Sequence, residues 1–136
     1  MGRIVGFKFE ELAVYWKAID FIDKVYALTR EYPNEEIFCL TSQLRRAAIS
    51  VSLNIAEGSS RTKKDFCRFL DVAKGSVHEC VAVLEVSLKQ NYINRSTFEK
   101  FREYLVEISK MLSGLKRSLT QPTTNSRQVG VRNRKA

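Results

Sequence analysis

The stretch QLRRAAISVSLNIAEG, residues 43–58, decides the fold, because on a helix it presents two apolar faces separated by polar side chains. With about 100° between successive residues, one face is an ordinary core face. Its members are Leu40, Leu44, Ala48, Val51 and Ile55. Ile49, Leu53 and Ala56 lie nearly opposite. A helix packed only within its own domain needs one apolar face, so the stretch predicts a helix that a second partner also covers.

A polar stripe runs between the two faces of this helix. Its central members, Ser50 and Asn54, are one turn apart and therefore project from the same side. A buried polar group left without a partner costs about 1–3 kcal/mol. We expect these two side chains either to bond a neighbouring helix or to cap the loop over residues 58–62.

The rest of the chain repeats the helical pattern. Apolar residues recur at spacings of three and four, alternation with a period of two is absent, and four segments of about 20 residues dominate. Short loops between long helices favour an antiparallel up-down-up-down bundle. The sequence therefore predicts an all-α four-helix bundle over residues 9–119, with residues 1–8 as an N-terminal extension and residues 120–136 as a disordered basic tail.

Local signals indicate where these helices end. The first helix should run from about residue 9 to 32 and stop at Pro33, and Asn34 is the expected N-cap of the second. Gly58 is expected to end the second helix in the left-handed conformation. Thr62 is expected to cap the third helix, and STFE at residues 96–99 fits a capping box for the fourth.

Composition limits the class of protein. The N-terminus has no apolar signal region, and no run approaches the roughly 18 apolar residues of a membrane span, so a cytoplasmic protein without membrane contact is expected. The cysteines, Cys39, Cys67 and Cys80, are three in number, lack C-x-x-C spacing and fall within helical patterns. We interpret them as reduced core thiols, with no metal site.

Catalysis has little support in the sequence. The chain has one histidine, His78, which faces outward, and Cys80 two residues later lies on another side of the helix. Phosphate-binding loops, dinucleotide-binding glycines and zinc-protease motifs are missing from the sequence. We expect a protein that is not an enzyme and has no cofactor.

The charge balance favours polyanionic partners. The chain has 23 Lys and Arg against 15 Asp and Glu, a net charge of +8. Residues 120–136 contain four basic and no acidic residues, so half of the excess lies in the tail.

Candidate residues for phosphate contact lie at three places. The first is a cluster at the start of the third helix, where helix N-terminal amides would add to the attraction: Arg61, Lys63, Lys64 and Arg68. The second is Arg45, expected to be more exposed than Arg46, which borders the polar stripe. The third is the tail, with Arg127, Arg132, Arg134 and Lys135. The cluster fits a solvated charged turn equally well.

A second set of residues is predicted to form an interface between copies of the chain. It combines the outer face of the second helix with one flank of the third. Its members are Ile49, Leu53, Ala56, Val72 and Val83. We predict that copies of the chain assemble through these surfaces.

One family shares the order of these residues. The chain resembles the small bacterial four-helix-bundle proteins encoded in intervening sequences of 23S ribosomal RNA genes, over about residues 7–119. The resemblance is carried by Phe9, Leu12, Trp16, Tyr26, Pro33-Asn34-Glu35, Leu40, Gln43-Leu44-Arg45-Arg46-Ala47-Ala48, Ser50, Asn54-Ile55-Ala56-Glu57-Gly58, Phe66, Phe69-Leu70, Ala73, Gly75-Ser76 and Glu79. The family is similar to the accessory variability determinant proteins of diversity-generating retroelements, which work with a reverse transcriptase and nucleic acid.

The resemblance implies a homopentamer of antiparallel bundles, no catalytic residues, and a role in nucleic-acid binding. Together with the charge, it predicts a protein that binds RNA or DNA backbone without reading sequence, as an accessory factor to a reverse transcriptase or a ribosomal RNA element. The alternative is a structural adaptor that binds a protein partner and uses its basic surface only for solubility.

Overall fold

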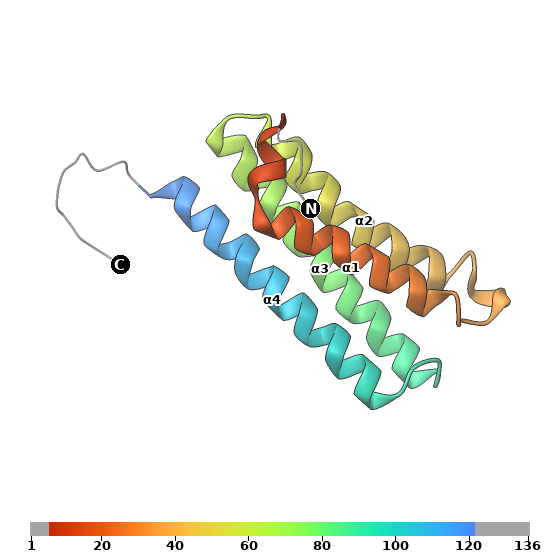
Figure 1. The fold of residues 1–136 in the computed structure, drawn as a ribbon. Helices are drawn as coiled ribbons and strands as arrows, with labels where there is room; N and C mark the ends of the chain where they lie inside the picture. Colours follow the sequence, from red (N-terminus) through yellow and green to blue (C-terminus); the bar gives the residue numbers. More distant parts are fainter. Residues whose placement is uncertain (1–5, 122–136) are drawn as a thin grey trace.

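The computed structural model describes residues 6–121, which form four α-helices, two short 3₁₀ helices and no strand (Figure 1). The long helices are α1 (Ala13–Thr29), α2 (Leu40–Ser59), α3 (Lys63–Lys89) and α4 (Arg95–Thr120). The 3₁₀ helices are η1 (Lys8–Glu11) before α1 and η2 (Asn34–Glu36) before α2. The all-α prediction is confirmed for this part of the chain.

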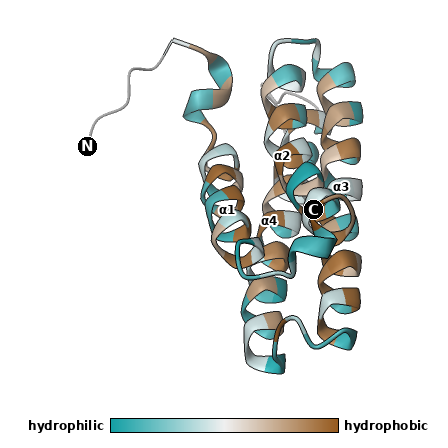
Figure 2. Ribbon diagram, turned by 90° about the vertical axis from the view of Figure 1, so that its right-hand side faces the viewer, coloured by the Kyte–Doolittle hydropathy of each residue, from teal (hydrophilic) through white to brown (hydrophobic). Residues whose placement is uncertain are grey.

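The centre of the bundle is the contact between α2 and α3. Helix α3 also packs along α4, and α2 along α1, whereas α1 and α4 touch at few points. Apolar and polar residues alternate along each helix (Figure 2), and the apolar sides meet in one core. Its largest fully buried side chains include Phe21, Leu44, Ile55, Leu70, Leu84, Leu105, Ile108 and Leu112.

Helix α2 has the two faces predicted from its sequence. Leu44, Ala48, Val51 and Ile55 are at most 1% exposed. On the opposite side, Leu53 is 61% exposed, although it is a large aliphatic residue. Part of the apolar surface of α2 is therefore not covered within the described part of the chain.

The first helix is shorter than the predicted range of residues 9–32, because α1 begins at Ala13 and ends at Thr29. Its N-terminal part is replaced by a separate turn. Residues 8–11 form η1, and Leu12 has an extended backbone (φ −98°, ψ 119°) that separates η1 from α1. The Glu10 carboxylate accepts hydrogen bonds from the backbone N–H groups of Gly6 and Phe7 at 2.9 and 3.0 Å, and these bonds lower the pKa of Glu10. This local bonding stabilises a separate turn, which periodicity does not reveal.

Two of the predicted caps are also misplaced. Asn34 belongs to η2, and α2 begins only at Leu40, whose backbone N–H donates to the Glu36 carboxylate at 3.3 Å. Helix α4 is capped by Asn94, whose side chain accepts from the Thr97 N–H at 2.8 Å, so the expected cap at Ser96 lies inside the helix. The Thr62 cap is confirmed, with the Asp65 N–H donating to its hydroxyl at 3.2 Å.

Gly58 has a different role from the predicted helix terminator. It lies inside α2, and no glycine of the described residues has a positive φ. A Cβ atom at this position would stand 2.7 Å from both Phe66 Cδ1 and Phe69 Cβ. The glycine is required because the aromatic residues at the start of α3 pack directly on the backbone of α2.

Replacing this glycine is expected to weaken the bundle. Gly58→Ala should lower the free energy of unfolding by about 1–3 kcal/mol, because overpacking outweighs the roughly 1 kcal/mol that alanine gains over glycine in a helix. Gly114→Ala in α4 is the matched control, since the nearest atom to its Cβ would be the end of Arg117 at 3.8 Å. Urea unfolding followed by circular dichroism measures both. Equal stabilisation of the two variants would contradict the packing argument.

Candidate functional site

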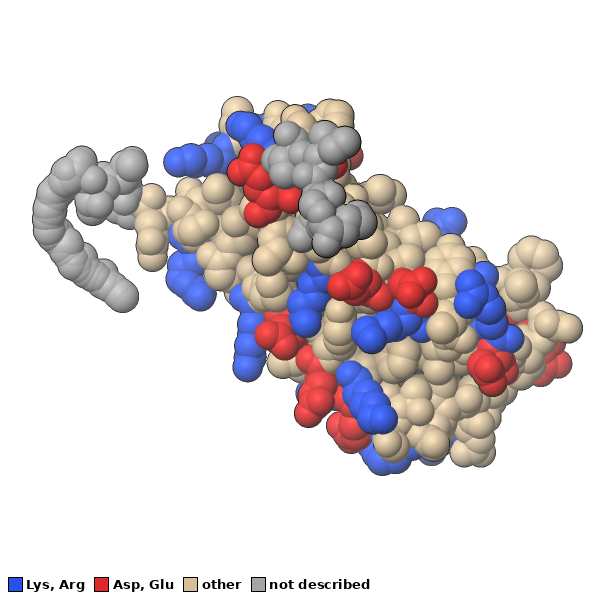
Figure 3. All heavy atoms as spheres, viewed as in Figure 1, with Lys and Arg blue, Asp and Glu red and all other residues tan. Residues whose placement is uncertain are grey.

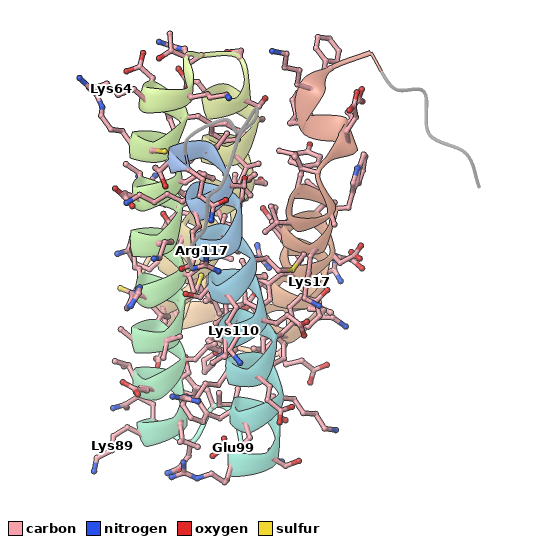
Figure 4. The ribbon with its side chains drawn as sticks, turned by 90° about the vertical axis from the view of Figure 1, so that its left-hand side faces the viewer. Lys17, Lys64, Lys89, Glu99, Lys110 and Arg117 are labelled. Atoms are coloured by element: carbon pink, nitrogen blue, oxygen red, sulfur yellow. The ribbon has the colours of Figure 1, made fainter. Side chains whose placement is uncertain are left out.

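The predicted basic cluster lies where α2 connects to α3. Arg61, Lys63, Lys64 and Arg68 are all exposed. Lys64 extends away from the first turns of α3, whereas Lys89 lies at the far end of the same helix (Figure 4). The structure therefore brings the four predicted cations together at one end of the bundle.

The four cations differ in how they are engaged. Arg61 Nη2 lies 2.8 Å from Glu57 Oε2, and its guanidinium lies over the Phe69 ring at 5.3 Å. Arg68 Nη1 is 3.7 Å from Asp65 Oδ1. Lys63 and Lys64 make no ion pair or hydrogen bond to another residue of the described range 6–121 through their ammonium groups. The two lysines are thus the cations of the cluster without a carboxylate partner there.

The last turns of α4 lie at the same end of the bundle as the basic cluster. Lys116 Nζ donates to both carboxylate oxygens of Asp71 at 2.8 and 3.0 Å, which places the end of α4 beside the first half of α3. This hydrogen bond raises the pKa of Lys116. The description ends at residue 121, so the tail cations Arg127, Arg132, Arg134 and Lys135 lie outside the described residues.

Arg45 does not have the exposed position expected for it. Its Nε donates to Thr29 Oγ1 at 2.9 Å, and its guanidinium lies 4.3 Å from the centroid of the Tyr26 ring. The side chain is half-buried and ties α2 to α1, while Arg46 is the exposed neighbour and forms no ion pair among residues 6–121. The order of exposure predicted for these two arginines is therefore wrong, and Arg45 is already used within the fold.

The outer sides of α2 and α3 form an apolar face, defined by Ile49, Leu53 and Val72. Leu53 is 61% and Val72 54% exposed, and Ile49 is half-buried. On α2 the face opens into a shallow hollow of about 430 Å³, which is lined by Arg46, Ile49, Ser50, Leu53, Asn54 and Glu57. The hollow therefore combines apolar and polar side chains along its middle with one charged side chain at each end.

Two predicted interface residues lie beside other parts of their own chain. Val83 belongs to the core and is 9% exposed, so its own chain already covers it. Ala56, which is one turn from Leu53 on α2, is half-buried and lines a hollow shared with η1, beside Phe7 and Phe9. Sequence reasoning missed Val86, which is 45% exposed and lies two heptads after Val72, a spacing that keeps both on one side of α3.

The polar stripe of α2 bonds a neighbouring helix, which was one of its two expected roles. Asn54 Nδ2 donates to the Ser50 carbonyl at 2.8 Å and to the Ser50 hydroxyl at 3.0 Å. The Ser76 hydroxyl of α3 donates to the Ser50 hydroxyl at 2.8 Å. The Ser76–Ser50 bond connects the middle of α3 to the middle of α2, whereas the Asn54 bonds stay within α2.

The face of the molecule drawn in Figure 3 carries charges of both signs. Basic and acidic side chains alternate over the face drawn in Figure 3. Ion pairs on the surface of the described residues include Lys17 with Glu107 at 3.9 Å and Arg95 with Glu99 at 3.5 Å. On this face the charges largely compensate one another.

The other chemistry-bearing side chains are dispersed. His78 is exposed, with Nδ1 2.7 Å from the Lys74 carbonyl oxygen. Among residues 6–121, no three His, Cys, Asp or Glu side chains gather closely enough to hold a metal ion. No helix in that range is long and apolar enough to cross a membrane.

The cysteines are not three core thiols as predicted. Cys39 is exposed just before α2, Cys67 is half-buried and only Cys80 is buried. Burial, together with the nearby Glu79 carboxylate, raises the pKa of the Cys80 thiol to about 12. The three thiols are all free and differ strongly in environment.

Comparison with known proteins identifies relatives of this fold. The family model described as "23S rRNA-intervening sequence protein" matches residues 10–114. A crystal structure from Bacteroides thetaiotaomicron VPI-5482, described as a protein with unknown function from the S23 ribosomal protein family, is similar with a TM-score of 0.71 and 26% identity. The similarity covers 77% of this chain and 99% of that one. A comparison with curated proteins found no significant match.

Thiol labelling at pH 8 should separate the cysteines by environment. In the native protein, iodoacetamide should alkylate Cys39 readily, because its side chain is exposed. Cys80 should stay unlabelled, since its raised pKa keeps it a neutral thiol, and react only in denaturant. Peptide mass mapping gives each rate. Native labelling of Cys80 as fast as that of Cys39 would contradict its buried position.

Proposed function

The chain belongs to the 23S rRNA-intervening sequence protein family, and we propose that it is a non-enzymatic, homo-oligomeric bundle protein that binds the phosphate backbone of RNA or DNA. The observation that carries the proposal is the group of exposed cations at one end of the bundle, in which Lys63 and Lys64 lack carboxylate partners among residues 6–121. Polyanion binding is the function that uses such a group.

The position of the cluster supports contact with phosphates. Lys63 and Lys64 lie in the first turn of α3, where backbone N–H groups without intrahelical partners also favour anions. The described part of the chain ends at Gln121, next to the last turns of α4 at this end of the bundle. The four tail cations that follow add to the positive charge of the chain.

Contacts of this kind position a nucleic acid without reading its sequence. Lysine is a compact point charge on a flexible stem, whereas base recognition uses bidentate hydrogen bonds to base edges. Phosphate contacts give affinity that depends on salt and not on sequence. We therefore propose sequence-nonspecific binding, as an accessory to a reverse transcriptase or a ribosomal RNA element.

Assembly is the second part of the proposal. Leu53 and the half-buried Ile49 line one hollow on α2, and Val72 and Val86 are further exposed apolar side chains on one side of α3, more than scattered single residues would provide. We propose that antiparallel up-down-up-down bundles join through this apolar face into a ring of five. Five copies would bring five basic clusters and five tails into one particle, which raises avidity for a long polyanion.

A structural adaptor is the alternative function. The apolar face of Ile49, Leu53 and Val72 would suit a protein partner as well as a second copy of the chain. The two functions differ in how binding responds to salt, since counterion release governs a phosphate interface but not an apolar one.

Charge reversal tests the nucleic-acid interface. The triple variant Lys63→Glu, Lys64→Glu, Arg68→Glu should weaken binding of a single-stranded RNA or a DNA duplex at least tenfold, because it replaces attraction with repulsion. Fluorescence anisotropy over a series of salt concentrations should also show a shallower dependence of log K on log salt.

A matched control changes net charge by the same amount elsewhere. Lys89, Arg102 and Lys110 are exposed and have no ion pair among residues 6–121. Their triple reversal to Glu should have a clearly smaller effect. Equal losses in the two variants would place binding on net charge alone, and salt-independent or absent binding by the wild type would favour the adaptor.

A single polar substitution tests assembly. Leu53→Asp should lower the solution mass to that of one chain while helicity is kept, because Leu53 is 61% exposed and does not support the core. Phe38→Asp is the control, since Phe38 is 91% exposed but lies before α2, away from the apolar face. Light scattering and circular dichroism measure the two properties. A Leu53→Asp protein that stays fully assembled would rule out this face as the interface.

A further inference from the structure

A groove between α1 and α4 is separate from both the basic cluster and the apolar face. It has a volume of about 460 Å³ and is lined by Lys24, Ala27, Leu28, Lys100, Phe101 and Tyr104. The groove exists because α1 and α4 are the least intimately packed neighbours of the bundle. Its size falls within the range of about 300–1,000 Å³ typical of small-ligand sites.

The floor of the groove is aromatic and held in place from below. The Phe101 ring meets the buried Phe21 ring edge-on at 6.0 Å between centroids, and the Tyr104 ring stacks on Phe21 at 5.8 Å. Phe21 is only 1% exposed. Two half-buried rings that rest on a fixed third ring provide a preformed surface for a flat apolar group.

The groove carries a cation from each helix. Lys24 comes from α1 and Lys100 from α4, both are exposed, and neither has an ion pair among residues 6–121. Lys24 Nζ lies 5.3 Å from the centroid of the Tyr104 ring, so its charge stands over the aromatic floor. Lys17 Nζ lies closer to the same ring, 4.1 Å from its centroid, but this ammonium is paired with the Glu107 carboxylate at 3.9 Å. An aromatic floor between two free ammonium groups suits a ligand that is flat and apolar in the middle and anionic at both sides.

We propose that this groove binds one unstacked base of a single-stranded nucleic acid, with the flanking phosphates contacted by Lys24 and Lys100. The inference rests on the proposed function and deepens it, because it specifies single strands over duplexes. A duplex keeps its bases stacked inside and cannot insert one without unpairing it. Aromatic contact with a base also tolerates any sequence, since every base has a flat face.

A strand without bases provides the decisive comparison. We would measure, by competition, the affinities of the wild-type protein for a 12-nucleotide thymidine strand and for an abasic 12-mer of the same charge. The base-bearing strand should bind roughly tenfold tighter, the effect expected for packing a base on an aromatic side chain. Backbone contacts alone would give equal affinities.

Two variants locate the effect in the groove. Ala27→Met fills the groove without adding charge or a ring, and it should abolish the preference for the base-bearing strand, so that the two strands bind equally. Ala13→Met is the control, on an exposed residue at the start of the same helix. Lys24→Glu with Lys100→Glu should weaken both strands more than the equally charged pair Lys89→Glu with Lys110→Glu.

The outcomes separate this inference from the proposed function. Equal binding of the two strands by the wild type would overturn the groove site while leaving backbone binding intact. A preference for bases that persists in Ala27→Met would overturn it as well, since the bases would then bind elsewhere. Absence of binding to either strand would overturn the proposed function and the groove site together.

Discussion

The close contact of α2 with α3 determines what the rest of the molecule can do. Gly58 allows Phe66 and Phe69 to pack on the α2 backbone, and the Ser50–Ser76 hydrogen bond connects the two helices at mid-length. Both interactions use the side of α2 that faces α3. Because α1 covers another side through the Arg45–Thr29 bond, the remaining side of α2, with Leu53, is left outside. The exposed apolar face is thus a consequence of how the helix is held.

The sequence predicts the faces of the helices well and their ends less well. Faces follow from a rotation of about 100° per residue, which accumulates over many residues and is difficult to misread. Caps depend on a single side chain, and several residues near each boundary satisfy the same rule. Both Asn94 and Ser96 fit an N-cap, and the chain uses Asn94 because its side chain reaches the Thr97 N–H. Similarly, Glu36 replaces Asn34 at the start of α2 by bonding the Leu40 N–H.

Residues at the flanks of a helix were the least predictable part of the candidate site. Arg45 and Arg46 are adjacent, and their environments are decided by α1, which brings Thr29 and Tyr26 within reach of Arg45 alone. Val83 and Val72 share a flank of α3, yet Val83 is covered and Val72 is not. Periodicity gives the direction of a side chain but not the position of its neighbouring helix. A burial assignment at a flank therefore requires the tertiary arrangement.

The ion pairs within the basic cluster bear on how much charge a polyanion would meet. Arg61 and Arg68 are paired with Glu57 and Asp65, but these are exposed pairs one turn apart on the surface. Such pairs stabilise a protein by about 0–1 kcal/mol. A charge-assisted hydrogen bond to phosphate is a stronger interaction. The paired arginines can therefore exchange partners, and the effective cluster is larger than its two unpaired lysines. Buried pairs would have fixed the cations in the fold, whereas this surface keeps them available.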